Sequence, residues 1–92
     1  MVKVDVLLFG ALARVAGRKE VAVEASTLLE ALEALSEEFG EEFNRRLFDD
    51  GGKPRRFINV YVNGRDMRFL DRLETELKGG DAVSVIPAVS GG

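Results

Sequence analysis

The chain has 92 residues, of which 46% are hydrophobic and 32% are charged, proportions typical of one folded and soluble domain. It contains no cysteine and no histidine, so disulfides, thiolate nucleophiles, the commonest general base and the commonest transition-metal ligand are excluded. A formal charge of -3 argues against nucleic-acid binding, and no apolar run is long enough for a membrane span or signal peptide. We therefore expect a cytoplasmic domain that binds neither nucleic acid nor membrane.

The N-terminal part of the chain predicts two strands joined by a short helical turn. Apolar and charged residues alternate in Val2–Leu8 and again in Lys19–Ala25, the period of two residues that is typical of a half-buried strand. Between them, residues 11–16 have room for little more than one helical turn before Gly17. Because neighbouring strands with a short connection pair most simply in opposite directions, we expect these two to be antiparallel.

An amphipathic helix is predicted to follow. Thr27 lies three residues before Glu30, the spacing of a capping box, and Gly40 is expected to end the helix. Glutamates occupy one side of the predicted helix, and the opposite side carries the apolar residues Leu28, Leu32, Leu35 and Phe39. Such a helix is suited to lie on a sheet.

Residues 41–56 form the least regular part of the sequence. We expect a second short helix there whose apolar side packs under the domain, built on Phe43, Leu47 and Phe48. The next segment, 49–54, is rich in glycine and charge and is predicted to be an exposed loop. Asp49 and Asp50 are adjacent carboxylates, but such pairs in glycine-containing loops are usually solvated, so no metal site is predicted.

Three further strands are predicted in the C-terminal part. Phe57–Val62 alternates in polarity and leads into Asn63-Gly64, the favoured pair for a two-residue type I′ hairpin turn. A short strand over 65–69 should follow, and the last strand should cover 82–86. Pro87 is expected to stop that strand because proline has no N–H group for the ladder.

Arginines also occur near the predicted hairpin, at Arg65, Arg68 and Arg72. They could steer an acidic partner, but scattered surface arginines are commoner than steering patches. No site is assigned to them from the sequence.

The order strand, strand, helix, strand, strand, strand predicts an α+β fold of the ubiquitin-like β-grasp type. This fold has a mixed five-stranded sheet with one main helix on one face. The other face would be partly exposed, and Phe57 and Tyr61 could lie on it as a partner surface. Alternatively, both aromatic residues pack under residues 41–56, and the sequence leaves the two possibilities open.

We expect residues 1–87 to form the β-grasp domain and residues 88–92 to form a flexible Gly-Gly tail. The expected partner-binding segment is Pro87, Ala88, Val89, Ser90 and Gly91, followed by Gly92. Glycine has no Cβ, so two terminal glycines make a slim end that could enter a narrow site on another protein. A frayed chain end is the simpler alternative.

Three segments of the sequence resemble the small subunit of molybdopterin synthase. Leu77–Gly92 resembles the C-terminal signature of that family: a Gly-Asp turn, an apolar strand, proline, small or apolar residues and a final Gly-Gly. Phe9–Gly17 resembles the segment after the family's first strand, and Val60–Gly64 resembles its hairpin. The longer stretch 41–56 looks more like archaeal-type members and like the sulfur carriers of a cysteine-forming pathway.

The resemblance implies a sulfur carrier whose reactive group is the carboxylate of Gly92. An adenylyltransferase similar to ubiquitin-activating enzymes would use ATP to adenylate this glycine, and sulfur would then displace AMP to leave a thiocarboxylate. The large subunit of molybdopterin synthase would receive the tail and pass the sulfur to a pterin precursor. The domain itself would be a non-catalytic carrier that binds no cofactor.

Three other functions stay open from the sequence. A ubiquitin-like modifier would be joined through Gly92 to lysines of target proteins. A sulfur carrier could instead serve the synthesis of cysteine or thiamin. A plain interaction domain with an idle tail is the fourth possibility.

Overall fold

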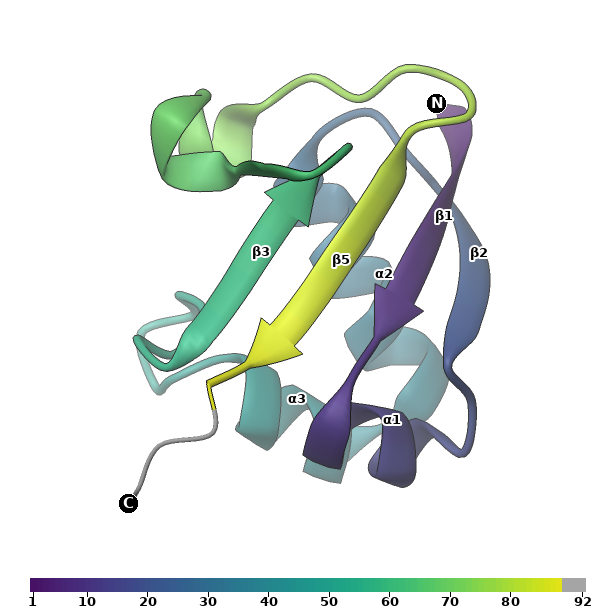
Figure 1. Cartoon of the computed structure of the whole chain (residues 1–92). Coiled ribbons are helices and arrows are strands. Elements are labelled where there is room, and N and C mark those ends of the chain that lie inside the picture. Colours follow the sequence, from purple (N-terminus) through teal and green to yellow (C-terminus); the bar gives the residue numbers. More distant parts are fainter. Residues whose placement is uncertain (89–92) are drawn as a thin grey trace.

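The computed structural model describes residues 1–88 as a sheet with helices packed against one of its faces (Figure 1). In chain order, the elements are β1 (Val2–Leu8), α1 (Gly10–Ala16), β2 (Glu20–Ala25), α2 (Leu28–Phe39), α3 (Glu41–Leu47), β3 (Ile58–Val62), β4 (Arg65–Asp66), the 3₁₀ turns η1 (Met67–Phe69) and η2 (Arg72–Glu74), and β5 (Ala82–Pro87). Within residues 1–88, no helix is long and apolar enough to cross a membrane.

The five strands form one mixed sheet in the order β2-β1-β5-β3-β4. β1 is antiparallel to β2, as predicted, and parallel to β5, while β3 is antiparallel to both β5 and β4. A parallel pair needs a long crossover, and here the helices lie between β1 and β5 in the chain and cover the back of the sheet in Figure 1. This arrangement confirms the predicted ubiquitin-like β-grasp fold.

The core lies between the sheet and the helices. Alternate residues of the strands face it, so that Val6 of β1 pairs with Val21 of β2 and Val83 of β5, and all three are buried. From the helices, the largest fully buried side chains are Leu12, Leu28, Leu32, Leu35, Phe43 and Leu47. The second short helix predicted within residues 41–56 is therefore confirmed as α3, with its apolar side in the core.

The start of α2 is the predicted capping box. The Thr27 hydroxyl accepts a hydrogen bond from the Glu30 N–H at 3.3 Å, and the Glu30 carboxylate accepts one from the Ser26 N–H at 2.7 Å. The hydrogen bond of the Glu30 side chain thus goes to Ser26, the residue before the N-cap Thr27. These bonds satisfy N–H groups that have no partner within the helix, which stabilises its first turn.

The fourth strand is shorter than predicted: β4 contains Arg65 and Asp66 only, so the expected strand over 65–69 is wrong beyond Asp66. The Asp66 carboxylate accepts a hydrogen bond from the Arg68 N–H at 2.8 Å and caps the turn η1. A local side-chain bond of this kind competes with ladder pairing and turns the chain away from the sheet.

A polar cluster ties the β3–β4 hairpin to the turn before β5. Asn63 and Gly64 both have positive φ, 53° and 83°, as a type I′ turn requires. The Asn63 amide donates to Asp81 Oδ1 at 3.0 Å and accepts from the Ala82 N–H at 2.9 Å. Asp81 Oδ2 also accepts from the Lys78 N–H at 2.8 Å. The two turns are thereby held in one register.

The substitution Asn63→Ala is expected to destabilise the domain by about 2–3 kcal/mol. It removes two side-chain hydrogen bonds, worth about 1 kcal/mol each, and places alanine at a positive φ. Urea unfolding at pH 7 measures this change. Asn63→Gly is the matched control, because it loses the same bonds but accepts the backbone conformation, and it should cost less. A loss of under about 0.5 kcal/mol for the alanine variant would contradict this account.

The stability that Asp81 contributes is expected to depend on pH. Hydrogen bonds from the Lys78 N–H and then from Asn63 hold the pKa of the Asp81 carboxyl below its usual 3.8. Because the folded pKa is lowered, this contribution is fully present above pH 3.8 and is lost as the pH falls through the folded value. Asp81→Asn should therefore cost up to about 1 kcal/mol at pH 7, and the difference from wild type should shrink below pH 3.8 in urea titrations. If wild type and Asp81→Asn differed by the same free energy of unfolding at pH 7 and below pH 3.8, the stabilising role of the ionised Asp81 would be contradicted.

Candidate functional site

The last strand, β5, leads directly to the residues predicted to form the tail. It lies between β1 and β3, and its final residue, Pro87, pairs with Ile58. Strand pairing thus runs one residue past the predicted end at Ile86. Ala88 is exposed, yet its N–H donates to the Phe57 carbonyl at 2.6 Å, so β3 directs the chain where it leaves the sheet. Of the predicted tail, residues 89–92, including Gly91 and Gly92, lie outside the described part of the chain.

Two half-exposed phenylalanines flank this exit. Gly10, which opens α1 with a φ of 59°, lies against Pro87, and a Cβ at that glycine would be 3.5 Å from the proline ring. The preceding Phe9 is 43% exposed, and Phe57 on the other side is 44% exposed. We call Phe9, Gly10, Phe57 and Pro87 the exit collar. Its two phenylalanines place half-exposed apolar surface at the ends of the strands on either side of β5.

The sequence did not single out Phe9 as a site residue. Its position follows from the parallel pairing of β1 with β5, which brings the end of β1 next to the end of β5. The local signal is strand alternation: the backbone of Phe9 is still extended, so its side chain lies on the face opposite the buried Leu8, and Gly10 then starts α1 with a positive φ.

The structure separates the two aromatic residues predicted to form a partner surface. Phe57 lies at the exit beside the loop that contains Lys53, Pro54, Arg55 and Arg56. Tyr61 is half-buried and pairs with Ser84, about 13 Å further along the strand direction. Since the neighbouring residues of Tyr61 in β3 are buried under the helices, Tyr61 lies on the open face of the sheet.

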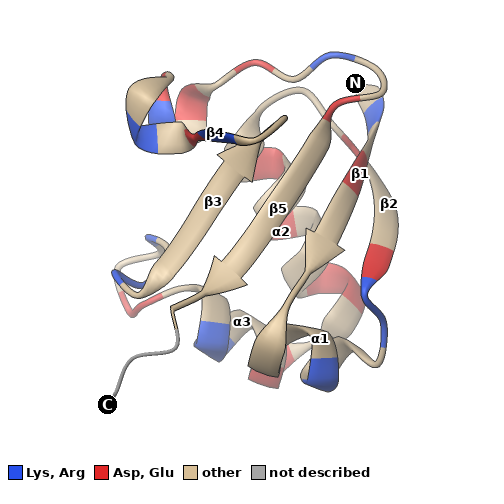
Figure 2. Ribbon diagram, viewed as in Figure 1, with Lys and Arg blue, Asp and Glu red and all other residues tan. Residues whose placement is uncertain are grey.

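The strip of the open face formed by β3 and β5 carries no charge. Neither strand contains an acidic or basic residue, whereas Figure 2 shows charges on the helices, the loops and the other three strands. The exposed Asp5 of β1 borders this strip of the open face beside Ala82. Half-buried apolar side chains from both central strands, Leu7 of β1 and Ile86 of β5, share this face with Tyr61. An uncharged face beside a chain exit is suited to contact with another protein.

The described part of the chain offers little chemistry of its own. Among residues 1–88, no group of three or more acidic, cysteine or histidine side chains is placed to hold a metal ion. Asp49, one of the adjacent acids in the loop, instead accepts hydrogen bonds from the N–H groups of Gly51 and Lys53 at 2.9 and 3.1 Å. This carboxylate therefore organises a turn.

The mixed sheet, the helices on one face and the central strand β5 that leaves the sheet at the exit collar define a ubiquitin-like β-grasp protein. Within this class, the chain belongs to the ThiS family, whose model matches residues 6–92.

Three relatives show the range of the family. The sulfur carrier protein CysO of Mycobacterium tuberculosis is 38% identical over 78 residues, which cover 83% of each chain. The small archaeal modifier protein 1 of Methanosarcina acetivorans superposes with a TM-score of 0.92 at 31% identity, covering 100% of this chain and 98% of that one. A chain of the BexX/CysO complex of Amycolatopsis orientalis matches with a TM-score of 0.81 at 37% identity, covering 97% and 99%. This protein is thus related to sulfur carriers and to ubiquitin-like modifiers.

Proposed function

We propose that this protein is a sulfur carrier that presents the carboxylate of Gly92 for conversion to a thiocarboxylate. The observation that carries the proposal is the family match, which runs through residue 92 and so includes the Gly-Gly end. The exit collar supports it, because it fixes the start of the tail at the surface and leaves four residues to follow Ala88. Four extended residues reach on the order of 13 Å, enough to enter another protein's active site.

The chemistry must be supplied by partners. A carboxylate is ionised at neutral pH and does not react with sulfur nucleophiles. In the proposed route, a carboxylate oxygen of Gly92 attacks the α-phosphorus of ATP and releases pyrophosphate, and a sulfur nucleophile then displaces AMP from the acyl carbon. The protein has no cysteine or histidine to take part in these steps, which is consistent with a separate ATP-using adenylyltransferase as the first partner.

The uncharged strip that β3 and β5 form on the open face is the proposed docking surface for these partners. Phe9 and Phe57 of the exit collar supply aromatic area beside Ala88, and Tyr61 supplies more about 13 Å further along the open face. Aromatic residues are enriched in protein interfaces because they bury a large area at a small entropic cost. The relative seen in the BexX/CysO complex supports a partner-bound role for this family.

For the acceptor pathway, we propose molybdopterin synthesis, with this protein as the small subunit of molybdopterin synthase and the large subunit as its second partner. The support is the C-terminal signature, in which a Gly-Asp turn, an apolar strand and Pro87 precede the Gly-Gly end. The similarity to the sulfur carrier protein CysO is equally compatible with the alternative of a carrier for cysteine or thiamin synthesis. The similarity to a small archaeal modifier favours conjugation of Gly92 to lysines.

Intact-mass analysis of the protein purified from its own host tests these proposals. Replacement of one oxygen by sulfur at the C-terminus supports the carrier. Larger conjugates that disappear when the two glycines are deleted support the modifier. If neither state is found, and deletion of Gly91 and Gly92 has no phenotype, both proposals fail. Identification of the protein that co-purifies with the thiocarboxylate form then distinguishes the large subunit of molybdopterin synthase from an enzyme of another pathway.

A further inference from the structure

A basic groove lies along the outer side of β3. Its volume is about 250 Å³, and its floor and one wall include Ile58, Asn59, Val60 and Met67. Its charged lining consists of four arginines, Arg55, Arg56, Arg68 and Arg72, and a single aspartate, Asp66. An excess of positive charge in one groove contrasts with the net charge of -3 for the whole chain. We call this feature the arginine groove.

The groove exists because the sheet is incomplete on this side. β4 pairs with Tyr61 and Val62 only, and among residues 1–88 no strand covers Ile58, Asn59 and Val60 on the side away from β5. The Asp66 cap turns the chain into η1 before it can follow β3 any further. On this edge the Ile58 N–H already donates to the Arg55 carbonyl at 2.9 Å, so Val60 offers the open pairing position within residues 1–88. An open position on a strand edge is a template for the addition of another extended segment.

Two of the four guanidinium groups are not engaged within the described domain. Arg68 binds the Asp66 carboxylate at 2.9 Å, and Arg55 donates to the Arg45 carbonyl at 2.6 Å. Arg56 and Arg72 are exposed and form no ion pair within residues 1–88. Arg72 also has a φ of 54°, a left-handed conformation that is uncommon for arginine and costs folding energy.

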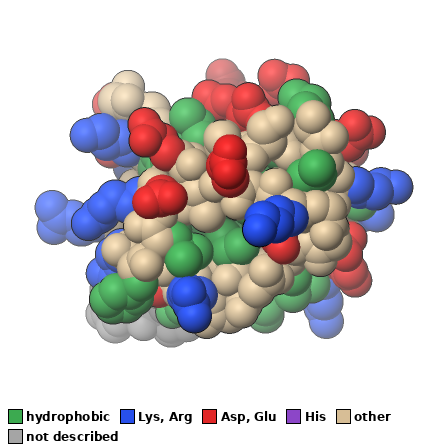
Figure 3. Space-filling model, turned by 90° about the horizontal axis from the view of Figure 1, so that it is seen from above, with side chains coloured by type: hydrophobic (Ala, Val, Ile, Leu, Met, Phe, Trp, Pro, Cys, Tyr) green, Lys and Arg blue, Asp and Glu red, His purple; other side chains and the backbone are tan. Residues whose placement is uncertain are grey.

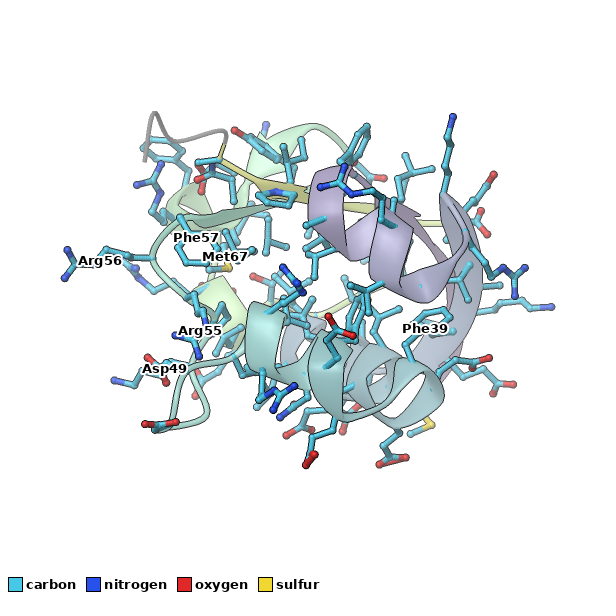
Figure 4. The ribbon with its side chains drawn as sticks, turned by 90° about the horizontal axis from the view of Figure 1, so that it is seen from below. Phe39, Asp49, Arg55, Arg56, Phe57 and Met67 are labelled. Atoms are coloured by element: carbon cyan, nitrogen blue, oxygen red, sulfur yellow. The ribbon has the colours of Figure 1, made fainter. Side chains whose placement is uncertain are left out.

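The figures show the same arrangement from two sides. In Figure 3, basic side chains gather on the flank that corresponds to β4 and the 3₁₀ turns. In the opposite view of Figure 4, Arg55, Arg56, Phe57 and Met67 lie on one flank, and Arg56 extends away from the body of the domain. The arginines therefore come from two segments, before β3 and after β4, which the hairpin brings to one edge.

We propose that the arginine groove binds an extended acidic segment of a partner protein. The segment adds along the open edge of β3 and places its carboxylates against Arg56 and Arg72. Charge complementarity favours acidic side chains, since one aspartate cannot balance four arginines. The open strand edge favours a peptide, whose backbone can pair with β3, over a nucleic acid. This role is independent of the thiocarboxylate chemistry, because it involves no residue of the tail.

The test is a two-dimensional NMR titration of the ¹⁵N-labelled full chain with a short synthetic peptide of alternating glutamate and valine, blocked at both ends. We expect amide shifts at Arg56, Asn59, Val60 and Met67. The double variant R56E/R72E should raise the dissociation constant by about tenfold or more, because it replaces attraction by repulsion. The matched control R14E/R18E reverses two exposed arginines near α1 and should change it by less than about twofold.

Salt dependence provides a second measurement that needs no variant. Raising NaCl from 0.1 M to 1 M shortens the screening length from about 10 to about 3 Å, so the affinity for the acidic peptide should fall. Salt-insensitive binding would overturn the proposal, as would shifts confined to β2, equal binding by R56E/R72E, or tighter binding of an oligouridine RNA than of the peptide. Absence of any binding would mean that the arginines serve only to keep sheet edges of separate molecules apart.

Discussion

Deletion of Gly91 and Gly92 is expected to abolish activation of the protein while leaving its folding unchanged. The deletion draws the terminal carboxylate back by about 7 Å, and a displacement of even 1 Å at a reacting centre can cost about a hundredfold in rate. ATP–pyrophosphate exchange with the activating enzyme measures the loss directly. Thermal unfolding should show no change, because the core consists of residues within the domain and the chain is already exposed at Ala88.

Single substitutions distinguish the effect of tail length on activation from the effect of tail width. Gly92→Ala keeps the length but widens the end by one methyl group, and we expect it to impair activation or sulfur transfer with folding intact. Ser90→Ala is the matched control, since it removes a hydroxyl without adding width. A large loss of thermal stability in Gly92→Ala would show that the tail belongs to the core. Unchanged exchange rates in the deletion variant would overturn the proposed carrier function.

The substitution Phe43→Ala is expected to lower the free energy of unfolding by about 3–5 kcal/mol. The Phe43 side chain is fully buried, and its ring packs 5.3 Å from that of Phe39 in a tilted arrangement. Removing it leaves a cavity between α3 and α2 that the surrounding helices can fill only in part. Since small domains are stable by about 5–15 kcal/mol, this change takes a large share of the total.

Urea unfolding measures the effect, and Phe69→Ala provides the matched control. Phe69 has the same chemistry but is 80% exposed in η1, so its loss should cost no more than about 0.5 kcal/mol. Similar costs for the two variants would show that α3 is not part of the core. Below its melting temperature, Phe43→Ala should still be activated at Gly92, because the exit collar contains no residue of α3.

Several features of this protein follow from short-range patterns in the sequence. Alternating polarity predicts β1, β2 and β3, a short apolar run predicts β5, and the Thr27–Glu30 spacing predicts the cap of α2. Asn63-Gly64 predicts the hairpin turn, and the apolar residues of 41–48 predict α3. These predictions are confirmed because the responsible forces act between residues that are close in the chain: backbone strain, capping bonds and the burial of one face of an element. The Gly-Gly end was also singled out from the sequence, although it lies outside the described residues.

Local sequence patterns gave a wrong prediction where strand pairing competes with a local side-chain hydrogen bond. The hairpin turn at Asn63-Gly64 predicts a strand over 65–69, but the bond from the Arg68 N–H to the Asp66 carboxylate ends β4 early. Propensity does not reveal which of these alternatives is lower in energy. The arginines near the hairpin were accordingly assigned no role from sequence spacing alone.

Only the tertiary structure decides which distant segments share a site. The parallel pairing of β1 with β5 brings Gly10 against Pro87, and the antiparallel pairing of β3 with β5 brings Phe57 to Ala88. The early end of β4 brings arginines from both sides of the hairpin to one open edge. Such contacts depend on the packing of the whole sheet against α2 and α3. Local sequence patterns therefore predict the helices, strands and turns of this protein. The exit collar and the arginine groove arise only when those elements pack together.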